Sequence, residues 1–300
     1  MLFRSQAPLR LVKRCSRYLS VTDLRREQIS KAVSADDVIA AKTAGRRCMC
    51  MTLNGVPLTE QWVSVEEELR YVRVFAGLGA RMMHLTYNRR NMIGDGCGEP
   101  ADGGLSDFGR AVVAEMNRVG VIVDVAHAGW RTSLDAARAS SRPMVASHSV
   151  CGELNPHCRS KPDEVIAAIV DTGGYIGICC IPAFLGRSGD IRAFLDHIVH
   201  VVSRFGADHV AIGTDVGWNG FWSNPVFARM PRAKRPRWES LWPANDALFD
   251  PAWQQKPQIE SMAWTNWPLF TVGLVQRGLS GEQIRKIIGG NVVRVLREAC

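Results

Sequence analysis

The chain has 300 residues, 46% of them hydrophobic, and a formal net charge of +8. This composition supports one large domain with a buried core, and no run of about 18 apolar residues indicates a membrane-spanning helix, so we expect no membrane partner. The nine cysteines are odd in number and include no Cys-x-x-Cys pair, which argues against a disulfide-stabilised fold and favours a cytoplasmic location.

The first 28 residues are basic and poor in acidic side chains, with Asp23 opposing seven arginines and lysines before residue 27. We expect a solvated, poorly ordered tail here. A transit peptide is the alternative, since the long apolar core of a secretory signal is missing. A second basic cluster at 229–237 lies among tryptophans. Basic residues interleaved with aromatic ones are typical of proteins that bind single-stranded nucleic acid. No nucleic-acid fold signature accompanies the cluster, so we expect no nucleic-acid partner.

Strand-like and helix-like segments alternate from residue 48 onward. Apolar runs predict six buried strands at 48–53, 82–86, 121–126, 144–147, 175–181 and 209–213. Amphipathic patterns and capping residues predict helices at 65–78, 106–119, 131–140, 163–171 and 190–205. Strands buried on both faces and separated by helices indicate a parallel sheet, and the regular repeat favours a single TIM-type (β/α)8 barrel spanning residues 1–300.

The remaining segments are expected to complete this barrel. Residues 216–262 are rich in tryptophan and proline and lack helical periodicity, so they predict a lid loop over the barrel mouth. Three helices are predicted at 267–277, 281–288 and 291–299. No Gly-x-Gly-x-x-Gly follows a strand, which weakens the alternative of a dinucleotide-binding open sheet.

Three side chains of the metal-ligand type stand at the ends of predicted strands: His127, His148 and Asp215. In a parallel barrel the carboxyl ends of the strands converge on one mouth, where catalytic groups gather. Imidazole and carboxylate are ligands of zinc, so the sequence predicts a hydrolytic metal site. The alternative is hydrogen-bonded core histidines and a turn-capping aspartate. Asp124 alternates with His127 along the strand and is expected either to pack or to orient a ligand.

Several motifs together cover the chain from about residue 30 to its end. They include Leu85-Thr86-Tyr87-Asn88 and the stretches 94–97, 104–109, 115–118, 123–127, 147–149, 159–164, 213–215 and 289–295. In combination they resemble the membrane dipeptidase (renal dipeptidase) family of zinc peptidases, which belongs to the metal-dependent amidohydrolase barrels. The resemblance is to a bacterial subgroup with Leu-Thr-Tyr-Asn in place of Leu-Thr-His.

The resemblance implies roles for individual residues. His127 and His148 would bind one zinc, Asp215 would contact the nucleophilic water and shuttle its proton, and Arg159 would hold the carboxylate of a dipeptide-like substrate. Asn54 stands where the family has a metal-bridging glutamate, and Tyr87 where it has a substrate-polarising histidine; we expect both to face the substrate. A homodimer is common in the resembled family, so we expect one here.

One family feature is missing. The family opens its barrel with a strand that ends in His-x-Asp, whereas the first histidine here is His84. We therefore expect a barrel that is incomplete at its N-terminus and holds at most one zinc. We consider three explanations for the missing strand: the basic tail supplies it, a partner chain closes the gap, or the reading frame begins downstream of the true start. The functional hypothesis is a metal-dependent dipeptidase-like hydrolase; the alternative is a catalytically inactive barrel retained for binding or assembly.

Overall fold

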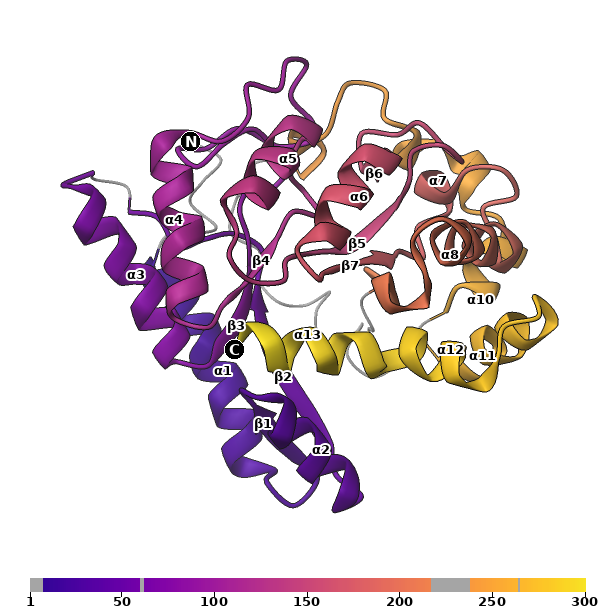
Figure 1. Ribbon diagram of the computed structural model, residues 1–300, viewed down its shortest axis with the longest axis horizontal. Coiled ribbons are helices and arrows are strands. Elements are labelled where there is room, and N and C mark those ends of the chain that lie inside the picture. Colours follow the sequence, from indigo (N-terminus) through magenta and orange to yellow (C-terminus); the bar gives the residue numbers. More distant parts are fainter. Residues whose placement is uncertain (1–7, 60–61, 217–237, 264) are drawn as a thin grey trace, which may run out of the picture.

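A computed structural model describes residues 8–59, 62–216, 238–263 and 265–300. Strands and helices alternate along the chain (Figure 1). The strands are β1 Ile29–Ala32, β2 Arg47–Leu53, β3 Ala80–His84, β4 Ile122–Asp124, β5 Val145–Cys151, β6 Ser160–Lys161, β7 Tyr175–Ile178 and β8 Val210–Ile212. The helices are α1 Pro8–Leu24, α2 Ala35–Thr43, α3 Val65–Gly77, α4 Asp107–Arg118, α5 Trp130–Ala139, α6 Asp163–Asp171, α7 Pro182–Leu185, α8 Ile191–Phe205, α10 Lys256–Ser261, α11 Trp267–Gln276, α12 Gly281–Arg285 and α13 Asn291–Ala299.

The strands form one parallel sheet in the order β1-β2-β3-β4-β5-β7-β8, with β6 paired to β5. All six predicted strands and the predicted helices between them are present, which confirms the parallel α/β architecture. Helices α4, α5 and α6 lie along the outside of the sheet (Figure 1). None of the helices in the described ranges is long and apolar enough to cross a membrane.

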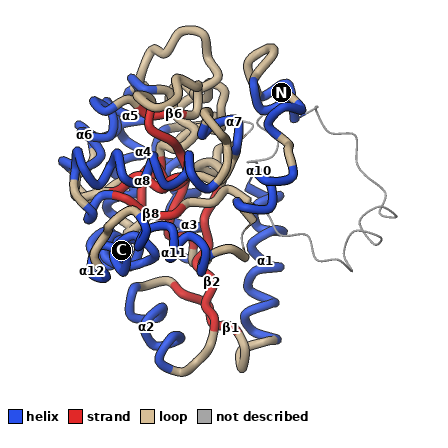
Figure 2. Tube along the Cα trace, turned by 90° about the vertical axis from the view of Figure 1, so that its right-hand side faces the viewer, coloured by secondary structure: helices blue, strands red, loops and turns tan. Residues whose placement is uncertain are grey.

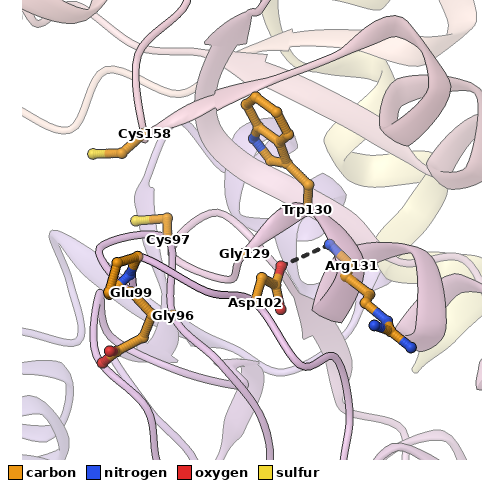
Figure 3. Close-up of a pocket in the computed structure, with 9 residues that line it drawn as sticks. Gly96, Cys97, Glu99, Asp102, Gly129, Trp130, Arg131 and Cys158 are labelled. Atoms are coloured by element: carbon orange, nitrogen blue, oxygen red, sulfur yellow. Dashed lines mark hydrogen bonds between the residues drawn. The ribbon is translucent and has the colours of Figure 1, made fainter.

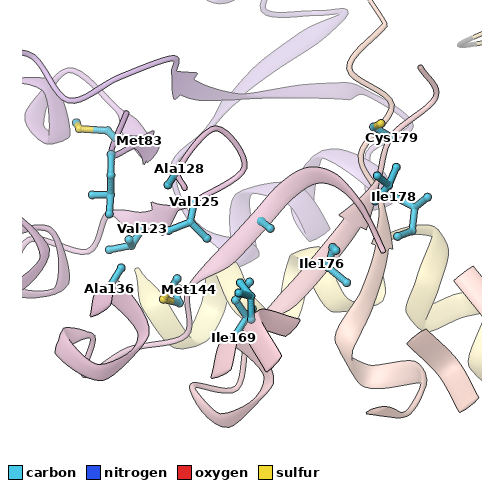
Figure 4. Close-up of a cluster of buried hydrophobic side chains, with 14 of the residues drawn as sticks. Met83, Val123, Val125, Ala128, Ala136, Met144, Ile169, Ile176, Ile178 and Cys179 are labelled. Atoms are coloured by element: carbon cyan, nitrogen blue, oxygen red, sulfur yellow. The ribbon is translucent and has the colours of Figure 1, made fainter. Parts of the chain in front are cut away.

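The core lies between this sheet and its outer helices. Figure 4 shows Met83, Val123 and Ile176 from three strands in one cluster with Ala136 of α5 and Ile169 of α6. Each of these side chains is at most 1% exposed. Burying a side chain of this size stabilises a fold by roughly 1.5–3 kcal/mol, so the cluster fixes the helices against the strands whose ends carry polar residues.

The N-terminal part differs from expectation. The predicted irregular tail is wrong for residues 8–24, which form α1. Its Leu11 and Cys15 are buried, and Tyr18 Oη donates a hydrogen bond to Met49 O of β2 at 2.7 Å. Figure 2 shows α1 running beside β1 and β2. A strand that no apolar run predicted, β1, follows this helix and extends the sheet.

The barrel does not close at this end. β1 pairs with the first half of β2, with Ala32 opposite Cys50, whereas β3 pairs with its second half, so β1 and α2 project from the body (Figure 1). Within the described ranges no hydrogen bonds join β8 to β1. Helix α13 lies across this side, where Asn291 Nδ2 donates to Ala207 O and Val210 O at 2.7 Å each. The expectation of an incomplete barrel is thus confirmed in the described part of the chain.

The predicted lid segment, residues 216–262, lies partly outside the described residues. Its described part, 238–262, is not a plain loop, because it contains three short 3-10 turns and α10. It packs against the loop that follows β3: Arg89 Nη2 donates to Trp242 O at 2.7 Å, and the Trp242 side chain is buried. The three predicted C-terminal helices are confirmed as α11, α12 and α13, with a π-helical turn at Lys286–Gly290.

Candidate metal centre

Histidines and aspartates gather at the carboxyl ends of three neighbouring strands. His84 ends β3, Asp124 ends β4 opposite it, and His148 lies within β5. His127 is not in β4 but follows it in a turn. That turn is held by Asp124 Oδ1, which accepts from Ala126 N at 2.9 Å and Ser147 N at 3.1 Å. The predicted alternation of Asp124 and His127 across the strand is therefore wrong, and both face the same cluster.

The three imidazoles and the carboxylate are in close contact. The ring centroids of His84, His127 and His148 lie 4.9–5.1 Å from one another. His127 Nε2 is 3.0 Å from His148 Nε2, and His84 Nε2 is 2.7 Å from Asp124 Oδ2. Ligand atoms of His84, Asp124 and His148 all lie within 4.8 Å of one another, which is the spacing of a cation-binding group.

Hydrogen bonds on the far sides of two rings set their orientation. His127 Nδ1 lies 2.6 Å from Asn88 Oδ1, which can only accept, so Nδ1 carries the proton and the lone pair of Nε2 faces the cluster. His148 Nδ1 lies 2.7 Å from Ser147 Oγ, which can donate or accept. His148 Nε2 can therefore hold a proton toward His127 or offer its own lone pair. Metal-binding histidines are commonly oriented in this way.

The electrostatics favour neutral imidazoles at His127 and His148 beside an ionised Asp124 carboxylate. Burial and then the positive charge of Arg159 lower the pKa of both His127 and His148 well below the usual value. Burial by itself raises the pKa of Asp124, but the adjacent His84, then His148 and Ser147, hold it well below its usual range. Neutral imidazole and ionised carboxylate are the protonation states that bind a cation.

These observations test whether a metal ion suits the residues. The two Nε2 atoms are 3.0 Å apart, slightly less than the roughly 3.3 Å that separates two ligands of a tetrahedral zinc ion, so a small outward shift of the rings would admit the ion. The buried His84 Nδ1 has no hydrogen-bond partner among the described residues, which shows that this ring is not held as an ordinary core histidine. The donor set fits a divalent cation of the zinc type.

Asp215, the third predicted ligand, lies at the edge of the cluster. Its Oδ1 is 3.9 Å from His148 Nε2, its side chain is 38% exposed, and its backbone adopts a left-handed conformation with φ 55°. Desolvation raises the pKa of Asp215, and the positive charge of Arg159 opposes that rise. The structure thus brings it near the imidazoles on the solvent side.

Arg159 is fully buried behind the histidines. Its Nη2 donates to His148 O at 2.8 Å and its Nε to Ala126 O at 3.2 Å, while Nη1 is buried without a partner in the described ranges. Tyr87 stacks on His127 with ring centroids 4.2 Å apart. Asn54 directly follows β2 and is exposed, and nearby Val56 N donates to His84 O at 3.0 Å.

Sequence reasoning missed His84 as a member of this cluster and gave Asp124 too small a part. His84 is the last residue of β3 and lies in register with Asp124. A polar residue at a strand end was the signal used for His127 and His148. The predicted strand 82–86 placed His84 inside an apolar run, where that signal is lost. His197 lies in α8 away from the cluster, where it bonds to Leu185 O and Cys151 N.

Comparisons with known proteins complete the description. A family model described as membrane dipeptidase (peptidase family M19) matches residues 6–224. Dipeptidase tcpJ of Claviceps purpurea is 30% identical over 283 residues, which cover 93% of this chain and 57% of that protein. The chain spans about half the length of the curated relatives it matches.

Two crystal structures share the fold. An amidohydrolase from Pseudomonas aeruginosa is 28% identical with a TM-score of 0.76, covering 96% of this chain and 84% of that one. A metallopeptidase from Rhodobacter sphaeroides, liganded with a phosphinate mimic of the dipeptide L-Ala-D-Ala, is 22% identical with a TM-score of 0.76, covering 100% of this chain and 76% of that one.

Proposed function

This chain belongs to the membrane dipeptidase family, and we propose that it is a metal-dependent hydrolase of small, dipeptide-like amides. The observation that carries the proposal is the buried pair His127 and His148, whose Nε2 atoms face each other at 3.0 Å beside Asp124. A buried group of neutral imidazoles and an ionised carboxylate at strand ends has little value for packing, because burying polar groups costs free energy. Its position at the barrel mouth favours catalysis.

We propose that His127, His148, Asp124 and His84 hold one zinc ion, which when bound would polarise the amide carbonyl and lower the pKa of water. We assign Asp215 the role of accepting a proton from water and returning it to the leaving amine, and its position 3.9 Å from His148 on the exposed side supports this role. The raised pKa of its carboxyl favours this exchange. Arg159 offers Nη1 to the terminal carboxylate of the substrate, and Tyr87 and Asn54 line the substrate side.

The test is metal content and turnover in wild type and His148→Ala. We expect about one zinc per chain in the wild-type protein and hydrolysis of members of a dipeptide panel. His148→Ala should lose both, because it removes a central ligand. His200→Ala is the matched control, since His200 pairs with Asp163 on an outer helix. Unchanged turnover in His148→Ala would refute the ligand assignment, and near two zinc ions per chain would contradict the single site.

The second candidate is a catalytically inactive barrel. It is favoured by the 2.7 Å contact between His84 Nε2 and Asp124 Oδ2, which gives the buried carboxylate a neighbour without a metal ion, and by Asn54 in place of the family glutamate. A zinc titration separates the candidates. The inactive barrel predicts weak zinc binding and no hydrolysis across the panel, whereas the hydrolase predicts stoichiometric binding with turnover.

We also propose a cellular compartment and an oligomeric state. All nine cysteines are free thiols, which favours a reducing compartment such as the cytoplasm.

A homodimer is favoured by exposed apolar side chains on α11, namely Leu269, Val272 and Val275. Sedimentation velocity of wild type and Val272→Glu measures this: the variant is expected to shift toward monomer.

A further inference from the structure

Two cysteines from distant parts of the sequence meet at one cavity beside the histidine cluster. Cys97 lies in the loop after β3 and Cys158 in the loop after β5, and both line a cavity of about 360 Å³. Figure 3 shows the two side chains on the same side of this cavity, one above the other. Both residues line this cavity and are partly exposed, so a small reagent can reach the two thiols.

Each cysteine is joined to the histidine cluster. Cys97 Sγ donates to Asn88 Oδ1 at 3.3 Å, the same oxygen that accepts from His127 Nδ1 at 2.6 Å. Cys97 N also donates to His127 O at 2.9 Å. Cys158 directly precedes Arg159, whose guanidinium binds His148 O. A covalent change at either sulfur therefore acts on residues that orient the two histidines.

Neighbours of Cys158 suggest a metal site at first sight, because His157, Cys158 and Asp246 form a compact group. The imidazole is already engaged at both nitrogens, however. Arg159 N donates to His157 Nδ1 at 3.1 Å, which fixes Nδ1 as the acceptor, and Nε2 then carries the proton that it donates to Asp246 Oδ1 at 3.1 Å. A cation would have to break one of these bonds. Thiol chemistry between the two cysteines leaves both of these His157 hydrogen bonds in place.

We propose that Cys97 and Cys158 are a modification site for thiol–disulfide exchange with a small disulfide of the glutathione type. The Cys97 thiolate attacks one sulfur of RSSR, forming a mixed disulfide and releasing RS⁻, which takes up the proton lost by Cys97. Cys158 then attacks the Cys97 sulfur, its proton passes to the second RS⁻, and the net products are one protein disulfide and two RSH. The protein thiols are oxidised and the small disulfide is reduced. The new bond links the two loops beside the histidine cluster and removes the Cys97 donor from Asn88.

The experiment treats the full-length protein with oxidised glutathione, blocks the remaining thiols by alkylation and maps the peptides without reduction. We expect a linked peptide containing Cys97 and Cys158 and a loss of two titratable thiols per chain, both reversed by dithiothreitol. In Cys158→Ser the second step is blocked, so one glutathionyl group should persist on Cys97. Cys50→Ser is the matched control, because Cys50 is an exposed thiol outside the cavity, and it should still form the linked peptide.

Recovery of Cys97 and Cys158 as separate alkylated peptides after treatment would overturn the inference, as would a linkage of either to another cysteine. A stable glutathionyl adduct on Cys97 in the wild-type protein would overturn it too, since Cys158 would then not resolve the mixed disulfide. The readout is independent of hydrolysis. Failure of the proposed function therefore shows in zinc content and turnover, and failure of this inference shows in the peptide map.

Discussion

A buried histidine outside the candidate metal centre should make the stability of the fold depend on pH. The His197 side chain is fully buried in α8, where Nδ1 accepts from Cys151 N and Nε2 donates to Leu185 O, both at 3.0 Å. Burial lowers its pKa from the usual 6.5 to about 4, against the opposing effect of the Leu185 carbonyl. Protonation would cost the hydrogen bond from Cys151, because a protonated Nδ1 cannot accept.

The sign and size follow from these two pKa values. Between pH 6.5 and pH 4 the unfolded chain binds a proton at residue 197 and the folded chain does not, so unfolding free energy rises with pH in this window. The contribution of His197 is fully present above pH 6.5 and is lost as the pH falls toward 4. At about 1.4 kcal/mol for each tenfold change in proton affinity, the loss is about 3 kcal/mol.

The assay is urea unfolding of wild type and His197→Gln at pH 7 and pH 4.5. At pH 7 the variant should be less stable by about 1–3 kcal/mol, because Cys151 N loses its acceptor. At pH 4.5 this deficit should shrink by about 2–3 kcal/mol, since only the wild-type side chain titrates. Ile198→Val is the control: it removes one buried methyl group at a cost of about 0.5–1.5 kcal/mol at either pH. A His197→Gln deficit that is equal at the two pH values would refute the reasoning.

Two further substitutions test how the site is built. Asn88→Ala removes the acceptor at His127 Nδ1 and should weaken zinc binding about 10- to 100-fold in a chelator competition. The control is Asn245→Ala, at an exposed residue with the same φ of 59°, which should leave zinc affinity unchanged. Equal zinc affinities of the two variants would contradict the orienting role of Asn88. Gly213→Ala places a methyl group 1.8 Å from Ser147 O and should lower the free energy of unfolding by about 3 kcal/mol or more. The control is Gly77→Ala, whose new methyl group has no neighbouring atom within 4 Å and should be neutral or slightly stabilising. A Gly213→Ala variant as stable as the wild-type protein would show that the strands can separate to admit the methyl group.

The part of the fold that sequence predicts is the part buried on both faces. β7, for example, is buried at all four of its residues and stands out as an apolar run. β1 has the sequence Ile-Ser-Lys-Ala, and only Ala32 is fully buried, because the strand lies at the edge of the sheet. Its pattern is therefore that of a loop. Helix α1 is hard to predict for a related reason: no acidic residue marks its first turn, and its basic residues are equally typical of a solvated tail.

In the site, too, some residues can be predicted from a single segment, whereas others come together only when two strands pair. His127 and His148 could be predicted because each follows its own apolar run. The contact of His84 with Asp124 depends on the register of β3 against β4, which puts these two residues opposite each other at the strand ends. Neither strand alone specifies that register; it comes from the packing of the apolar side chains beneath, such as Met83 beside Val123. This register thus puts a histidine and an aspartate beside the two proposed ligands, His127 and His148. The zinc content of His84→Gln distinguishes two roles of His84. If His84 is a zinc ligand, the variant should bind less zinc than the wild-type protein; if His84 only contacts Asp124, the zinc content should not change.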